Sequence, residues 1–193
     1  YEVDHRLLPF LRETGALCQE ASADHGMRFC LDVRATDFME EAADGLSGSL
    51  FGRGSGRRFN CAILNPPYTK IRADSKARAT LREMGIEASN LYAAFVAIAI
   101  TLLEPGGEIV AITPRSFCNG PYFRLFRQHL LDSVTLRRIH LFDRRDRAFS
   151  DDAVLQENLI FHATKGGKRD RVVVSCSSGP DAAGSTTREV DYA

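Results

Sequence analysis

The sequence predicts one α/β domain, and three observations lead to this prediction. The chain has 193 residues, of which 44% are hydrophobic, enough to bury one substantial core. The short apolar run Cys61–Leu64 and the segment Glu108–Thr113 have the length of buried strands, whereas the apolar run Leu91–Leu103 is long enough for a helix. Turn-forming prolines or glycines follow each run. We therefore expect helices packed on a mostly parallel sheet that ends in an antiparallel C-terminal hairpin.

The first third of the chain is predicted to alternate between strands and a helix. Tyr1–Asp4 has the composition of the end of a strand whose beginning is missing, so we expect an internal fragment of a longer protein. Pro9 suits the first turn of a helix that runs to about Ala23, because the N–H that proline lacks is not needed there. Arg28–Val33 then predicts the next strand.

The rest of the chain continues this alternation. Residues 69–89 are charged and favour a helix, and Asn90 is expected to be the N-cap of the helix at 91–103, which Pro105-Gly106-Gly107 would end. The remaining predicted elements are a helix at 120–132, strands at 136–142 and 154–162, and an edge strand at 172–174. Residues 177–193 are rich in Ser, Gly, Ala and Thr without a period, which predicts a linker.

The net charge is zero, but the charges are unevenly distributed along the chain. Residues 1–52 carry ten acidic and four basic side chains, residues 53–78 carry one acidic and seven basic, and residues 115–147 carry three acidic side chains and eight arginines. The two basic segments lie on either side of residues 65–68, as a site for a polyanion would require. Ordinary solvated charges on helix surfaces are the alternative.

Composition also limits the compartment and the metal chemistry. The five cysteines are scattered and lack a C-x-x-C spacing, which favours reduced thiols in a cytoplasmic protein over disulfides or a zinc site. His129 and His140 have no second ligand at metal spacing, so we expect no metal. The longest apolar run has 13 residues, too few to span a bilayer, and we expect no membrane partner.

The strongest candidate site is Asn65-Pro66-Pro67-Tyr68, which follows the apolar run ending at Leu64. Two consecutive prolines remove two backbone donors, so the loop presents acceptor oxygens. Asn65 adds a side-chain carbonyl, and Tyr68 adds a flat ring for stacking. Acceptors at Asn65 and Pro66 would hold both hydrogens of a planar amine and direct its lone pair toward an electrophile. The alternative is a rigid turn that only ends a strand.

The order of the motifs resembles that of the S-adenosylmethionine-dependent amino-methyltransferases, above all the N(6)-adenine DNA methyltransferases of type IIG restriction-modification enzymes and their stand-alone relatives. This resemblance implies a Rossmann-like fold whose first strand, with its glycine motif, is missing here. It also implies a partial catalytic domain over residues 1–175 and a flexible tail or linker over 176–193. The matching residues are Tyr1-Glu2-Val3-Asp4, Asp37-Phe38, Asn65-Pro66-Pro67-Tyr68, Asn90-Leu91-Tyr92, Gly106-Gly107, Thr113-Pro114 and Ala148-Phe149.

The resemblance assigns roles to individual residues. It implies that Asn65, Pro66, Pro67 and Tyr68 are catalytic, and that S-adenosyl-L-methionine is the cofactor. Glu2, with Asp4 second, would bind the ribose of the cofactor. Asp37 would accept from the amine of the cofactor's adenine and Phe38 would stack on that ring, with Asp32 as a competitor for Asp37. Phe149 would stack with Tyr68 on the target base.

The resemblance implies a site-specific adenine methyltransferase that acts on a flipped base in double-stranded DNA, within a restriction-modification or related defence system. A recognition domain or subunit downstream is the expected partner. Two alternatives stay open. One is an amino-methyltransferase that acts on RNA or on a protein glutamine, and the other is a catalytically silent DNA-binding subunit with the same fold.

Overall fold

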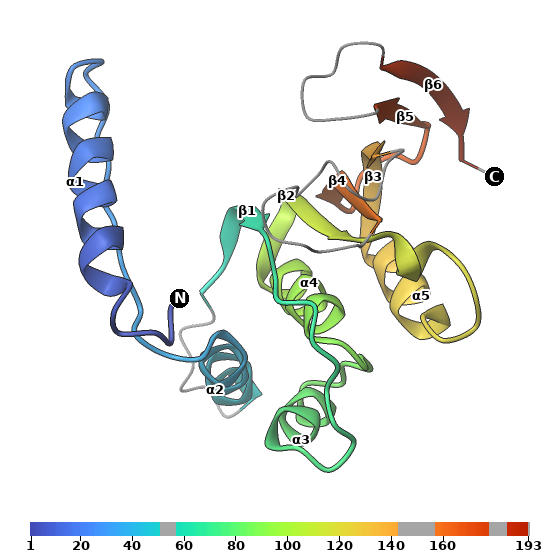
Figure 1. The fold of residues 1–193 in the computed structure, drawn as a ribbon, viewed down its shortest axis with the longest axis horizontal. Helices are drawn as coiled ribbons and strands as arrows, with labels where there is room; N and C mark the ends of the chain where they lie inside the picture. Colours follow the sequence, from blue (N-terminus) through green and yellow to red (C-terminus); the bar gives the residue numbers. More distant parts are fainter. Residues whose placement is uncertain (51–56, 143–156, 178–184, 193) are drawn as a thin grey trace.

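The computed structural model describes residues 1–50, 57–142, 157–177 and 185–192. Their centre is a six-stranded sheet of order β1-β2-β4-β3-β5-β6 (Figure 1). The β1·β2 and β3·β5 pairs are parallel, and the other three pairs are antiparallel. The α/β prediction and its antiparallel hairpin, β3·β4, are confirmed, although the described sheet is mixed. The strands are β1 (Phe59–Leu64), β2 (Leu103–Pro114), β3 (Val134–Phe142), β4 (Asn158–Lys165), β5 (Arg171–Ser177) and β6 (Thr186–Asp191).

The helices α2 (Phe38–Leu50), α3 (Lys76–Glu83), α4 (Leu91–Leu102) and α5 (Arg124–Ser133) gather on one face of the sheet (Figure 1). Helix α4 contacts β1, β2, α2 and α5. Its sequence is apolar on all sides, as a helix enclosed by other elements requires. The core therefore lies between α4 and the sheet, and it extends along α5.

The junction between α4 and β2 differs from its prediction. The helix ends at Leu102 and β2 begins at Leu103, so Pro105-Gly106-Gly107 lies inside β2 and does not end the helix. The Lys165 Nζ donates to the Thr101 carbonyl at 3.0 Å and to the Leu103 carbonyl at 2.6 Å. These bonds satisfy carbonyls that every helix C-terminus leaves without an intrahelical partner.

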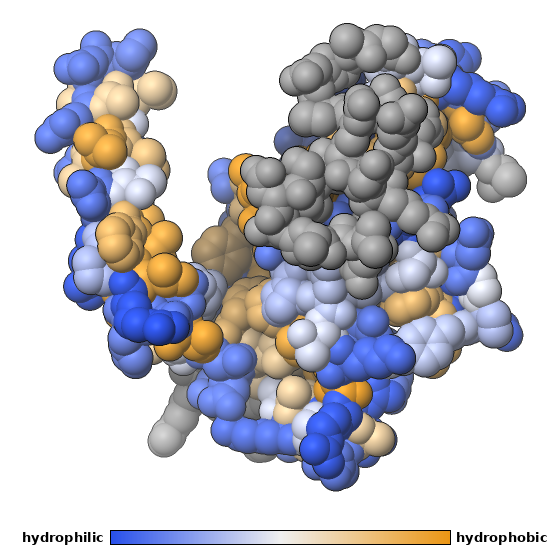
Figure 2. All heavy atoms as spheres, viewed as in Figure 1, coloured by the Kyte–Doolittle hydropathy of each residue, from blue (hydrophilic) through white to orange (hydrophobic). Residues whose placement is uncertain are grey.

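Helix α1 (Leu8–Ala23) lies at the predicted position, but it stands apart from the sheet (Figure 1). Its apolar residues Phe10 and Leu17 are exposed. Figure 2 shows apolar surface both on α1 and on the part of the body that faces it. Within the described ranges, no helix is both long and apolar enough to cross a membrane.

Two predicted strands are wrong. Tyr1–Asp4 and Arg28–Val33 have extended stretches without strand pairing, and one backbone bond, from Glu2 N–H to the Arg34 carbonyl at 2.9 Å, joins the two regions. A strand needs a ladder of such bonds to a neighbour. Residues 28–33 instead lie against α1, where Leu31 closely approaches Gly15.

The prediction for the C-terminal tail is also corrected. Thr186–Asp191 forms β6, which pairs with β5 along its length, so this part of the expected linker belongs to the sheet. Strand β5 pairs with β3 on its other side, so the predicted edge strand at 172–174 lies inside the sheet. Because β5 runs to Ser177, it crosses the expected boundary between the catalytic domain and the tail at residue 175. All six side chains of β6 are exposed, which leaves no alternating apolar pattern for the sequence to reveal.

Candidate active site

The Asn65–Tyr68 loop begins where β1 ends, at the carboxyl edge that β1 shares with its parallel neighbour β2. In open α/β sheets, ligands bind at this edge. Asn65 and Pro67 are exposed, whereas Pro66 is buried. Asn65 has no hydrogen bond to any described residue through its side chain, so its carbonyl is available to a ligand.

Tyr68 joins this loop to the core. Its ring contacts the buried Tyr92 edge-on, with centroids 6.3 Å apart and an interplanar angle of 87°. The Tyr68 hydroxyl is buried and has no partner in the described part of the chain, and burial raises the pKa of Tyr68 above its usual range. The ring is therefore neutral and fixed by packing.

Tyr92 is the support behind Tyr68. Burial raises the pKa of Tyr92 to about 12, and its hydroxyl lies 3.4 Å from the Ser116 Oγ. Tyr92 also contacts Phe123 and Phe126, with centroid distances of 5.7 and 6.2 Å. The Asn65–Tyr68 loop thus rests on aromatic residues from α4 and from the start of α5.

The segment after Tyr68 is fixed by backbone bonds to the start of α4. The Leu91 N–H donates to the Thr69 carbonyl at 2.9 Å, and the Ile71 N–H donates to the Ser89 carbonyl at 2.8 Å. Asn90 occupies the predicted N-cap position of α4, but its side chain makes no capping bond, and its Oδ1 is buried without a partner among the described residues. The position is confirmed and the capping interaction is not.

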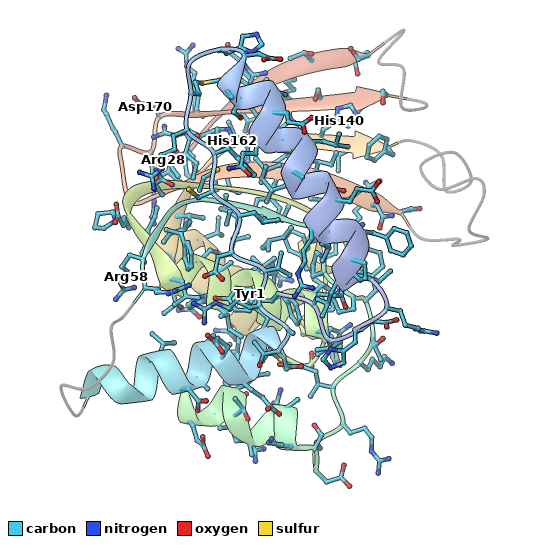
Figure 3. The ribbon with its side chains drawn as sticks, turned by 90° about the vertical axis from the view of Figure 1, so that its left-hand side faces the viewer. Tyr1, Arg28, Arg58, His140, His162 and Asp170 are labelled. Atoms are coloured by element: carbon cyan, nitrogen blue, oxygen red, sulfur yellow. The ribbon has the colours of Figure 1, made fainter. Side chains whose placement is uncertain are left out.

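A pocket of about 360 Å³ runs along β1 and reaches Leu64, the residue before Asn65. Tyr1, Phe38 and Phe95 form its aromatic wall, with centroid distances of 5.1 Å between Tyr1 and Phe38 and 5.1 Å between Phe38 and Phe95. Figure 3 shows Tyr1 between the sheet and α2. The other lining residues are Phe59, Cys61, Ala62, Ile63, Leu64, Ala99 and Leu102.

The predicted cofactor carboxylates lie beside this aromatic wall, in the residues that adjoin Tyr1 and Phe38. The Asp37 Oδ1 accepts from the Met39 N–H at 2.8 Å and from the Glu40 N–H at 3.2 Å, so it caps α2, a helix that the sequence did not predict. The Glu2 Oε1 accepts from the Asp4 N–H at 2.7 Å. Within the described residues, the second oxygen of each carboxylate accepts no hydrogen bond, so it is available to a ligand.

The two competing carboxylates are held by arginines. Hydrogen bonds from Arg6 lower the pKa of Asp4, and bonds from Arg57 and then Arg34 lower the pKa of Asp32. An acid already paired with a guanidinium is a weaker candidate for a ribose than one with a free oxygen. By this criterion, Glu2 and Asp37 remain the predicted cofactor carboxylates.

Sequence reasoning found some of these residues and missed others. Phe38 lines the pocket as its predicted role would require, whereas Tyr1 and Phe95 were not singled out. Phe95 lies in an apolar helix, where a core role was the natural interpretation. Phe149 lies outside the described residues. All five cysteines are free, and no described group of three or more His, Cys, Asp or Glu side chains is placed to hold a metal ion.

A family model described as Eco57I restriction-modification methylase matches residues 24–149. The chain belongs to this family. It is 49% identical to the Type II methyltransferase M.BsuBI of Bacillus subtilis over 179 residues, which is 92% of this chain and 34% of that protein. The chain therefore spans about a third of this curated relative.

Solved structures support the same fold assignment. The type IIG restriction endonuclease BpuSI matches with a TM-score of 0.58 and 16% identity, over 81% of this chain and 21% of that one. A class I S-adenosylmethionine-dependent methyltransferase of Listeria monocytogenes matches with a TM-score of 0.51 and 14% identity, over 66% and 39% of the two chains. The Eco57I-family chain thus has the Rossmann-like methyltransferase fold that its motifs predicted.

Proposed function

We propose that this chain is the catalytic part of a DNA adenine methyltransferase that uses S-adenosyl-L-methionine, in a restriction-modification system. One observation carries the proposal: the acceptor-rich loop Asn65–Tyr68, at the carboxyl end of β1, directly adjoins an aromatic pocket that runs along this strand. The relative M.BsuBI is named a Type II methyltransferase, and membership of the Eco57I family supports the same reaction class.

The residues around the pocket suit the cofactor. Phe38 offers a ring face to an adenine, and Asp37 offers an acceptor to its amine. Glu2, beside Tyr1, offers a carboxylate to the ribose hydroxyls. S-adenosylmethionine, when bound, supplies an electrophilic methyl group. The pocket ends at Leu64, so the next residue, Asn65, stands between the cofactor side and the substrate side.

Asn65 and Pro66 orient the substrate amine. The lone pair of an adenine amine is delocalised into the ring, which makes the nitrogen a poor nucleophile. The Asn65 side-chain carbonyl and the Pro66 carbonyl accept its two hydrogens and turn its lone pair toward the cofactor side. Positioning and electrostatic stabilisation then lower the barrier without a general base. Tyr68 supplies the flat surface behind the base.

An adenine inside a duplex cannot reach this loop, so the target base leaves the helix at a cost of a few kcal/mol. Stacking on Tyr68 returns about 1 to 3 kcal/mol. Phe149 is proposed as a second stacking residue on sequence grounds alone. A recognition domain downstream of this chain would select the site.

The substrate test uses the complete protein with labelled cofactor and duplex DNA, followed by digestion to nucleosides and mass spectrometry. We expect N(6)-methyladenine. Label in N(4)-methylcytosine would contradict the base assignment. Label found only in RNA or in protein would contradict the substrate class, and DNA binding with no transfer at all would favour the silent subunit.

The catalytic test is Asn65→Ala, with Asn60→Ala at the other end of β1 as a matched control, since both side chains are exposed. Asn65→Ala should lower the rate more than tenfold, about 1.4 kcal/mol or more, and leave cofactor binding and thermal stability unchanged. Asn60→Ala should leave the rate unchanged. An Asn65→Ala rate above about a tenth of wild type would show that Asn65 does not orient the amine.

A further inference from the structure

The segment that follows β2 lies at the same edge of the sheet as the catalytic loop. Strands β1 and β2 are parallel, so the loop after Leu64 and the segment after Pro114 leave the sheet on the same side. That segment comprises a short 3-10 helix (Arg115–Cys118), a turn and the start of α5. It therefore borders the site that we assign to the target base.

Tyr122 is an unusual side chain on this segment, because 60% of its surface is exposed. Its ring packs edge-on against the buried Phe123, with centroids 4.9 Å apart and an interplanar angle of 85°, and this contact holds the ring in place. Leu125, also 60% exposed, lines the same shallow depression as Tyr122. Exposed aromatic and apolar side chains that are held in place favour contact with a partner.

The charge of the segment suits a polyanion. Residues 115–131 contain three arginines and no acidic residue. Arg124 is exposed, and its guanidinium has no hydrogen bond or ion pair within the described ranges, whereas the guanidinium of the nearby Arg78 donates to Glu87 and to the Ala88 carbonyl. A free guanidinium next to an exposed ring is a suitable contact for a phosphate and its neighbouring nucleotide.

Arg127 fixes the backbone just before Tyr122. Its guanidinium donates to the carbonyls of Phe117 at 2.8 Å, Asn119 at 3.2 Å and Gly120 at 2.7 Å. Gly120 has a φ of +73°, which a residue with a side chain would adopt at a cost. Three bonds from one side chain hold the turn in a single conformation, so less ordering remains to be done on binding.

We propose that Tyr122 and Arg124 form a DNA contact beside the target-base site, with Arg127 as the positioning residue of its turn. Arg124 binds a backbone phosphate, and the Tyr122 ring packs on the adjoining nucleotide. The ring contacts from Tyr68 through Tyr92 and Phe123 to Tyr122, of 6.3, 5.7 and 4.9 Å, place Tyr122 within about 17 Å of Tyr68. At about 3.4 Å per nucleotide, this is a reach of at most about five nucleotides.

This inference rests on the proposed function, and its test measures duplex DNA binding by the complete protein as a function of salt. Each lost phosphate contact reduces the magnitude of the negative slope of log K against log[salt] by about 0.9. Arg124→Ala should show this decrease, and Tyr122→Ala should weaken binding about tenfold. Tyr122→Phe should bind nearly as well as wild type, because the ring and not the hydroxyl makes the contact.

The matched control is Arg188→Ala on β6, which lies at the opposite end of the strand order from β1. It should leave the salt slope unchanged. Arg127→Ala should raise the KM for DNA and leave the KM for the cofactor near wild type, whereas a general loss of folding would lower the apparent kcat and leave both KM values unchanged. An unchanged slope in Arg124→Ala, with wild-type methylation of DNA intact, would overturn this inference alone. Absence of DNA binding by the wild type would overturn the proposed function as well.

Discussion

Replacing Tyr192 by Phe tests how the C-terminal residues are attached to the sheet. The Leu136 N–H donates to the Tyr192 Oη at 2.5 Å, and that hydroxyl donates to the Leu136 carbonyl at 3.2 Å. Strand β3 pairs with β5 only from Arg138 onward, so on this side Leu136 lies beyond the ladder. The hydroxyl therefore does for Leu136 what a neighbouring strand would do.

The magnitude follows from these two bonds. The variant loses both, at a net cost of about 0.5 to 1.5 kcal/mol each, and it leaves the Leu136 N–H in a half-buried position without its partner. We expect a loss of about 1 to 3 kcal/mol in the free energy of unfolding. In a domain of this size, such a loss lowers the Tm by roughly 2 to 4 °C per kcal/mol.

Urea unfolding measures the loss, and hydrogen exchange at the Leu136 amide measures its location. Tyr122→Phe is the matched control, because the Tyr122 hydroxyl has no bond in the described structure; its free energy of unfolding should change by less than about 0.5 kcal/mol. A Tyr192→Phe variant as stable as this control, with unchanged exchange at Leu136, would refute the proposed attachment.

Two further predictions concern stability. In Gly107→Ala, the new Cβ would lie 2.9 Å from the Glu104 carbonyl oxygen and 3.2 Å from the carbonyl oxygens of Phe59 and Asn60. Backbone atoms cannot rotate away as a side chain can, so we expect urea unfolding to show a loss of about 1 to 3 kcal/mol in the free energy of unfolding. An unchanged free energy of unfolding would show that β1 and β2 can separate to make room. Burial lowers the pKa of His129 below its ordinary value of 6.5. The stability that the neutral imidazole contributes is therefore present above pH 6.5 and is lost as the pH falls through the lowered pKa. His129→Gln should flatten this part of a plot of unfolding free energy against pH, and an unchanged plot would contradict the lowered pKa of His129.

The elements that the sequence predicted well are those whose apolar composition indicates that they are buried. The apolar runs at 61–64 and 91–103 became β1 and α4, with boundaries shifted by at most two residues. Arg28–Val33 has similar strand-forming residues but no strand beside it, and propensity does not specify a partner. Strand β6 shows the opposite case, because its sequence has no alternating apolar pattern and its side chains are exposed, yet its backbone bonds to β5 make it a strand.

The candidate site was predictable where it depends on local sequence. The Asn65–Tyr68 loop lies at the predicted strand end, and Phe38 lines a pocket. The cap that Asp37 places on α2 could have been inferred from an acidic residue before a helix, had the helix been recognised. Tyr1 and Phe95 enter the pocket only through tertiary packing, which brings residues 1, 38 and 95 into one row.

Tyr92, the ring behind the Asn65–Tyr68 loop, belongs to a larger aromatic cluster. From Tyr92, edge-on contacts continue through Phe126 to Phe117, and from there to Phe161 in β4. Replacing Phe161 by a smaller side chain would therefore also alter the packing of Tyr92, which lies three ring contacts away and supports Tyr68. In this molecule, interior side chains that touch no substrate set the shape of the surface on which a base would lie.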